Sequence, residues 1–130
     1  MSRVTRQKMV YRNDLKVNPN VLYLFGDNIA RMGFGGQAGQ MRDEPNAIGV
    51  ATKKYCSNTD ECFFSDDDLV KFAKVVDADL LPVFSHVKHG GSIVIPTDGL
   101  GTGLSELSTR APKCFEYLER QLNLLEKMGE

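Results

Sequence analysis

The residues with the clearest chemical meaning are three alternating glycines in the segment SIVIPTDGLGTGLS, residues 92–105. Gly99, Gly101 and Gly103 follow an apolar run that is typical of a buried strand, and a helix is expected to begin soon after them. Glycine adopts positive φ and lets the main chain approach an anion without a Cβ, and a helix start adds partial positive charge. This pattern predicts a loop that wraps a phosphate with backbone amides.

A second glycine cluster lies in the segment RMGFGGQAGQMR, where it follows a strand-like run at residues 21–25. Gly33, Gly35 and Gly36 make a loop certain at this point, and the alternative to ligand contact is an ordinary flexible connection. Two such loops at the ends of two strands predict a nucleotide-like ligand with more than one sugar or phosphate to hold.

Other polar residues stand near these loops. Asp27 and Asn28 come at the end of the second strand, where α/β sites gather, so they either line the pocket or cap a turn. Asp98 precedes the alternating glycines and could order them by accepting backbone amides. His86 and His89 have no nearby Cys or carboxylate ligand, so we expect surface histidines and no metal site.

The elements that must position these residues alternate along the chain. Ser65 and three following aspartates favour a helix start, and we expect this helix to reach about Asp77. Pro112 lies in the first turn of a longer helix expected over residues 109–127. Alternating strands and helices predict an α/β layered fold. We expect four strands, at residues 9–12, 21–25, 47–52 and Ser92–Pro96.

Composition limits the class of protein. With 130 residues, of which 42% are hydrophobic, the chain fits one domain over residues 1–130. The balance of 16 basic and 17 acidic residues leaves no global field to gather nucleic acid or to bind an anionic membrane. No segment has the roughly 18 apolar residues of a membrane span. Cys56, Cys62 and Cys114 match no disulfide or metal spacing, which indicates a cytoplasmic protein.

The order of these motifs resembles the macrodomain superfamily, whose members bind ADP-ribose. The resemblance covers roughly residues 10–122 and is strongest to the terminal ADP-ribose protein glycohydrolases, through Asn13-Asp14-Leu15, Arg31-Met32-Gly33, Thr52-Lys53 and the segment IVIPTDGLGTGLS. A small group of tailed-phage proteins with a macrodomain-like fold is also similar, through the segments FGDN and GGQA. The resemblance implies one three-layer domain with a mixed sheet flanked by helices. Because most macrodomains add a strand after the last helix, we expect a smaller or reordered sheet here.

The resemblance assigns binding roles position by position. Asp14 would accept a hydrogen bond from the adenine amino group, and a turn-forming aspartate is the alternative. The Gly33–Gly36 loop would lie near the distal ribose, with Gln37 hydrogen-bonded to sugar hydroxyls. The two phosphates would be held by the backbone amides of Gly99, Gly101, Gly103 and Leu104 and by the Thr102 hydroxyl.

The catalytic pattern of the glycohydrolases is matched only in part. Lys53 has the position of a lysine that attacks the distal ribose, for which burial or a nearby cation must free the amine. A strand-end lysine in solvent is the alternative. The assisting aspartate of that family is Ser105 here, which lacks a carboxylate's charge. Glu106 could take its place if the loop register shifts, or could favour the start of the last helix.

Three functions are compatible with these residues. The first is binding of ADP-ribose or a related nucleotide, free or attached to a protein, with no metal or cofactor. The second is an ADP-ribosyl hydrolase that removes ADP-ribose from proteins and depends on Lys53. The third is an interaction protein that has lost the ligand. Ser105 favours binding over hydrolysis, and the bare glycine loop favours binding over a lost site.

Overall fold

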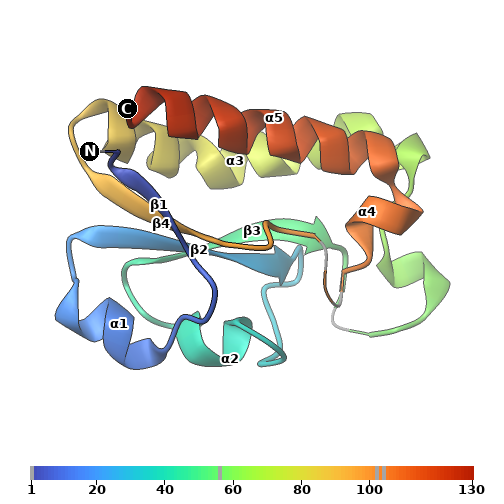
Figure 1. Cartoon of the computed structure of the whole chain (residues 1–130). Helices are drawn as coiled ribbons and strands as arrows, with labels where there is room; N and C mark the ends of the chain where they lie inside the picture. The colour runs from blue at the N-terminus through green and yellow to red at the C-terminus, as the bar shows by residue number, and fades with distance from the viewer. Residues whose placement is uncertain (1, 56, 102, 104) are drawn as a thin grey trace.

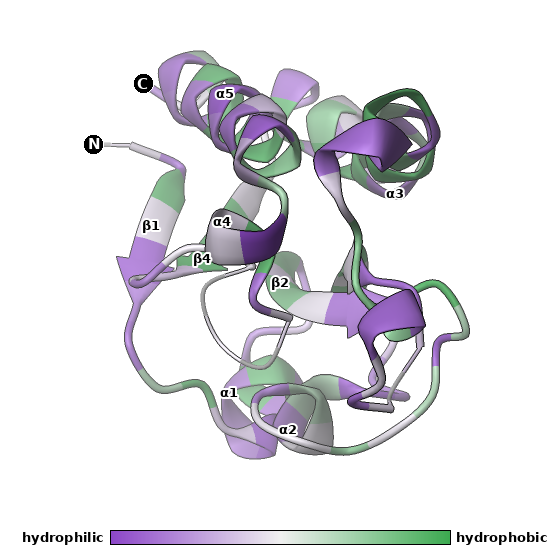
Figure 2. Cartoon of the chain, turned by 90° about the vertical axis from the view of Figure 1, so that its right-hand side faces the viewer, coloured by the Kyte–Doolittle hydropathy of each residue, from purple (hydrophilic) through white to green (hydrophobic). Residues whose placement is uncertain are grey.

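The computed structural model describes residues 2–55, 57–101, 103 and 105–130. Helices α3 (Leu69–Lys88) and α5 (Pro112–Met128) cover one face of a sheet, and α1 (Arg12–Val17) and α2 (Ala38–Met41) lie on the other face (Figure 1). Figure 2 shows α3 and α5 side by side on their face of the sheet. The predicted α/β fold, with a sheet between helical layers, is confirmed.

The sheet contains β1 (Val4–Gln7), β2 (Val21–Asn28), β3 (Ala47–Lys53) and β4 (Ser92–Pro96), in the order β1-β4-β2-β3. Every strand pair among the described residues is parallel, so the expectation of a mixed sheet is wrong. The physical reason is that each strand is joined to the next through a helix on one face. Such a crossover brings the next strand into the sheet in the same direction as the previous one, whereas a tight hairpin would make the two strands antiparallel.

The first strand lies earlier than the sequence predicts. β1 is Val4–Gln7, and the predicted strand at residues 9–12 is instead a connection that enters α1. Asp14 starts that helix, because its Oδ2 accepts the Tyr11 backbone N–H at 2.8 Å. This contact is half of a capping box, which satisfies an amide that a helix start leaves without a backbone partner.

The two long helices also depart from their expected ends. The helix after Ser65 begins with a short 3-10 turn, η2 (Asp66–Asp68), and α3 then continues to Lys88, well beyond Asp77. Its apolar stripe continues past Pro82, and burial of Leu80 before the proline and Val83 after it stabilises the helical turns on both sides. The helix expected over residues 109–127 is split at Ala111 into α4 (Leu107–Arg110) and α5. Pro112 causes the break, because proline disfavours helical backbone in the residue before it.

Each face of the sheet has its own apolar core. Leu24 of β2 and Ile93 and Ile95 of β4 pack under α3 and α5. Tyr23 and Phe25, the neighbours of Leu24 in β2, point to the opposite face. Successive side chains of a strand alternate between faces, so one buried strand serves both cores. The expected strands at residues 21–25, 47–52 and Ser92–Pro96 are confirmed, and β2 extends further, to Asn28.

Candidate functional site

The topology opens a cleft at the carboxyl ends of β2 and β4. These strands are neighbours in the sheet, but the chain leaves β2 toward α2 on one face and leaves β4 toward α4 and α5 on the other. Connections that depart in opposite directions from adjacent parallel strands leave a crevice between them, which is where ligands bind in open α/β sheets. The crevice here has a volume of about 380 Å³, within the usual range of ligand pockets.

Most of the residues singled out in the sequence line this one cleft. These residues come from two chain segments, one before α3 and one after it. Lys8 and Asp98 line the same cleft. The predicted residues brought together are Asp27, Asn28, Gly33, Gly35, Gly36, Gln37, Lys53, Gly99, Gly101, Gly103 and Ser105. Thr102 and Leu104 lie outside the described residues.

Two predicted residues are placed elsewhere. Asp14 is not among the residues that line the cleft; its carboxylate caps α1 and also accepts the Gln7 amide at 3.1 Å. Glu106 is the N-cap residue of α4, is exposed, and accepts the Arg110 guanidinium at 3.4 Å. Glu106 has the helix-start position that the sequence offered as its alternative. Asp14 has a local role as a helix cap, whereas the alternative offered for it was a turn-forming aspartate. Ser105, the neighbour of Glu106, lines the cleft.

Two of the three alternating glycines after β4, Gly99 and Gly101, have the backbone that the sequence predicts. Gly99 and Gly101 have φ of 79° and 86°, in the region that favours glycine. At Gly101 a Cβ would also lie 2.9 Å from the Leu107 side chain, so this position is required by the fold. Gly103 is different, because among the described residues no atom outside its own chain neighbours lies within 4 Å of the place a Cβ would take. Packing of the described residues therefore does not require glycine at this position.

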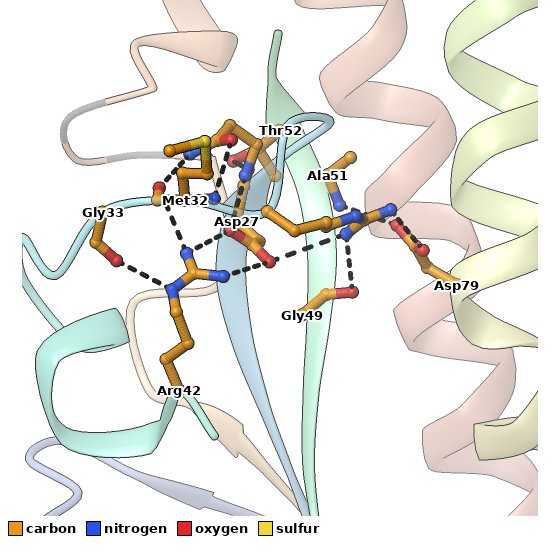
Figure 3. A network of polar contacts seen from close by, with 10 residues as sticks. Asp27, Met32, Gly33, Arg42, Gly49, Ala51, Thr52 and Asp79 are labelled. Carbon is orange, nitrogen blue, oxygen red and sulfur yellow. Dashed lines mark hydrogen bonds and ion pairs between the residues drawn. The ribbon is translucent and has the colours of Figure 1, made fainter. Parts of the chain in front are cut away.

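The glycine loop after β2 is held by an arginine that the sequence analysis missed. Arg42 donates from Nε to the Gly33 carbonyl at 2.7 Å, and its two terminal nitrogens meet the Asp27 carboxylate at 2.5 and 3.2 Å (Figure 3). The Asp27 side chain is only 3% exposed. A bidentate pair of this kind is strong and directional. Asp27 therefore shapes the loop through Arg42, and the sequence signal was the arginine at the end of RMGFGGQAGQMR.

A second arginine extends this network to the free edge of β3. Arg31 reaches Asp27 at 3.7 Å and Asp79 of α3 at 2.6 Å, and it donates to the Gly49 carbonyl at 3.2 Å. Asp79 in turn accepts the Ala51 backbone N–H at 2.9 Å. These contacts cover polar groups of an edge strand, which would otherwise be open to pairing with another chain. The sequence did not indicate Asp79, because the helix that carries it is remote from the loop.

Two amide side chains that could contact a sugar anchor the backbone around the cleft. Asn28 donates to the Met32 carbonyl at 2.7 Å, and Gln37 accepts the Val10 backbone N–H at 3.0 Å. The first contact closes the turn after β2, and the second joins the start of α2 to the connection between β1 and α1. The Gln37 amide nitrogen also lies 3.6 Å from the Met9 sulfur, a weak acceptor.

Lys53 is buried at the end of β3, which contradicts the alternative of a lysine in solvent. The residue is 7% exposed; its Nζ donates to Asn58 Oδ1 at 3.3 Å and lies 4.5 Å from the centre of the Phe63 ring. The guanidinium of Arg110 lies 3.8 Å from the centre of the same ring. An amide oxygen and an aromatic face are partners of a charged ammonium. Asn58 and Phe63 were missed because they belong to an irregular connection without hydrophobic periodicity.

The described cysteines, Cys62 and Cys114, and the two histidines are not among the residues that line the cleft. Burial raises the pKa of the Cys114 thiol to about 11, which disfavours the reactive thiolate. A hydrogen bond from Thr59 lowers the pKa of Cys62. His86 is half-buried, and its Nε2 lies 3.1 Å from the Ser92 carbonyl oxygen, so it is not the surface histidine that the sequence predicts, whereas His89 is exposed as predicted. The described part of the chain holds no group of three or more His, Cys, Asp or Glu residues able to bind a metal.

Comparison with known proteins identifies a family. No curated protein and no solved structure matches the chain. In the described residues, no helix is both long enough and apolar enough to cross a membrane. One family model matches residues 5–121, a region that contains every residue lining the cleft. The chain therefore belongs to the family of unknown function DUF7831.

Proposed function

We propose that this protein binds ADP-ribose or a related nucleotide in the cleft at the carboxyl end of its sheet. The observation that carries the proposal is that both glycine-rich loops, one after β2 and one after β4, line a single cleft of about 380 Å³. A nucleotide with two sugars and two phosphates needs contacts from more than one loop. Positive φ at Gly99 and Gly101 gives this loop its turn. The Gly99 N–H already donates to the Pro96 carbonyl at 2.9 Å, so a phosphate would meet other amides of the loop.

The charges that line the cleft are compatible with an anionic ligand. Lys8 and Lys53 are both there, whereas the charge of Arg42 is matched by Asp27. Asp98 is an acidic group at the same surface and limits how close a phosphate comes to that part of the loop. The lysines and the glycine amides together favour a ligand with phosphates over a neutral sugar or base.

Hydrolysis of an ADP-ribosyl bond is the second candidate. It is favoured by one observation, that Lys53 and Ser105 line the same cleft. Against it, Glu106 pairs with Arg110, and Lys53 contacts groups that suit a charged ammonium more than a free amine. We therefore place binding ahead of catalysis.

The compartment is part of the proposal. The described cysteines, Cys62 and Cys114, are free thiols, as is usual in a reducing environment. We infer that the protein acts in the cytoplasm, where nucleotides are available, and that its ligand is either free or attached to another protein.

Calorimetric titration with ADP-ribose tests the proposal, with ADP, AMP and NAD as comparison ligands. We expect saturable binding that is weakened by Gly103→Glu, because Gly103 lines the cleft and the added carboxylate would repel an anionic ligand. The melting temperature of this variant should match that of the original protein. Absence of heat and of thermal stabilisation with all four ligands would overturn the proposal and favour an interaction protein without a nucleotide.

A further inference from the structure

Two consecutive lysines at the end of β3 have matching surroundings that differ in one group. Lys54 Nζ lies 3.2 Å from the Asp68 carboxylate and 5.9 Å from the centre of the Phe64 ring. Lys53 Nζ lies 3.3 Å from the Asn58 amide oxygen and 4.5 Å from the centre of the Phe63 ring. Each ammonium therefore has one oxygen and one aromatic face. The oxygen at Lys54 carries a negative charge, whereas the oxygen at Lys53 is neutral.

The lysine without a counter-charge is the more deeply buried one. Lys53 is buried, with 7% of the residue exposed, whereas Lys54 is half-buried. Within the described parts of the chain, no carboxylate forms an ion pair with Lys53, although Lys54, Arg31 and Arg42 all have one. A buried charge is costly unless it is paired, and a neutral hydrogen bond with a ring offsets only part of that cost.

The position of Lys53 indicates which molecule could supply its negative counter-charge. Lys53 lines the cleft together with the glycine loops, so the region around this lysine is open to a ligand. Lys8 also lines the cleft but is exposed, so water already stabilises its charge. The Arg42 guanidinium is satisfied by Asp27 and by backbone carbonyls. Lys53 is therefore the cation for which an incoming anion brings the largest gain.

We propose that Lys53 is an anion receptor that forms an ion pair with a phosphate or carboxylate group of the ligand. Because the Asn58 side chain is neutral, it does not form that ion pair itself. The inference rests on the proposed function for its site, because the same cleft is used. It differs in giving Lys53 a fixed charge where the resemblance to glycohydrolases implies a nucleophile. A carboxylate at position 58 would supply the missing charge from within the protein and compete with the ligand.

The test compares three variants of the full chain with inorganic phosphate, pyrophosphate and acetate as probes, and with adenosine as a neutral molecule. Binding is measured by calorimetry and by thermal shift. We expect Lys53→Gln to weaken pyrophosphate binding at least tenfold. Asn58→Asp should weaken it to a similar extent while raising the melting temperature of the free protein. Lys54→Gln is the matched control, because Lys54 already has Asp68, and it should bind as the original protein does.

The outcomes separate this inference from the proposed function. Lys53-dependent binding of pyrophosphate by a protein that ignores ADP-ribose would support the receptor and overturn the nucleotide. Binding of ADP-ribose that is unchanged in Lys53→Gln and Asn58→Asp would support the nucleotide and overturn the receptor. No binding of any anionic probe by the original protein would also overturn the receptor. Preference between phosphate and acetate identifies the chemical source of the anion.

Discussion

Asp27 and Lys53 are both charged, both 7% exposed, and both at the carboxyl ends of neighbouring strands, yet their surroundings differ. Asp27 is met by Arg42 at 2.5 Å and by Arg31 at 3.7 Å, whereas Lys53 is met by an amide and a ring. A charge that is fully paired within the protein holds the shape of a loop. A buried charge without a counter-ion can stabilise a ligand, because binding then adds an ion pair that folding left out.

Removal of Arg42 should give the largest effect. In Arg42→Ala the Asp27 carboxylate remains buried without its bidentate partner, and we expect the free energy of unfolding to fall by about 3–5 kcal/mol. Chemical denaturation measures this loss. Arg120→Ala is the control, because Arg120 and Glu116 form an exposed helical pair worth about 0.3–0.5 kcal/mol. Similar small losses in both variants would show that the Asp27 network does not hold the fold.

Gly49→Ala should disturb the same network from the other side. A Cβ at this position would lie 2.4 Å from Asp27 Oδ2, so either the carboxylate or the strand must move. Overpacking of this kind costs about 1–3 kcal/mol, which a thermal melt detects. Gly103→Ala should leave the melt unchanged, since nothing lies within 4 Å of its added methyl group. Equal stability of the two variants would contradict the tight contact at Asp27.

Phe63→Leu probes the Lys53 side of the comparison. The variant removes the ring beside Lys53 and Arg110, and we expect a loss of about 1–2 kcal/mol in the free energy of unfolding. Denaturant titration in the Lys53→Gln background provides the control. The loss should be smaller there, because one of the two cations that the ring stabilises has gone. An undiminished loss would show that the Phe63 ring does not stabilise the charge of Lys53.

The pair Lys54–Asp68 should give the smallest effect, seen only in acid. Burial acts to raise the pKa of Asp68, but hydrogen bonds from Ser65 and Lys54 outweigh it and hold the pKa below the ordinary value of 3.8. A carboxyl group of this kind stabilises the folded state at pH above 3.8. That contribution is lost as the pH falls through the lowered pKa.

The Asp68→Asn variant checks this dependence. The difference in unfolding free energy between the original protein and the variant should be constant at neutral pH and should shrink as the pH falls below 3.8. Acid titration of stability at several fixed denaturant concentrations measures that difference. A difference that does not change with pH would mean that Asp68 contributes through its shape and not through its charge.

The predictions from sequence that failed have local physical causes. The apolar runs of β2, β3 and β4 were sufficient to find these strands, because each is buried in the sheet. β1 was missed because only Val4 of its four residues is buried, so the strand has no apolar run. The predicted end of α3 at Asp77 was too early, because burial of Leu80, Val83 and Val87 stabilises the helical turns on both sides of Pro82.

The sequence by itself determined the alternation of strands and helices and the two glycine-rich loops, because hydrophobic period and the freedom of glycine are local properties. Only the tertiary structure decided that β4 lies beside β2, which brings the two loops to one cleft and leaves Asp14 and Glu106 outside it. It also decided that Lys53 is buried against Asn58 and Phe63. Strand order and contacts between distant segments depend on how whole elements pack, and neither residue type nor spacing encodes that packing.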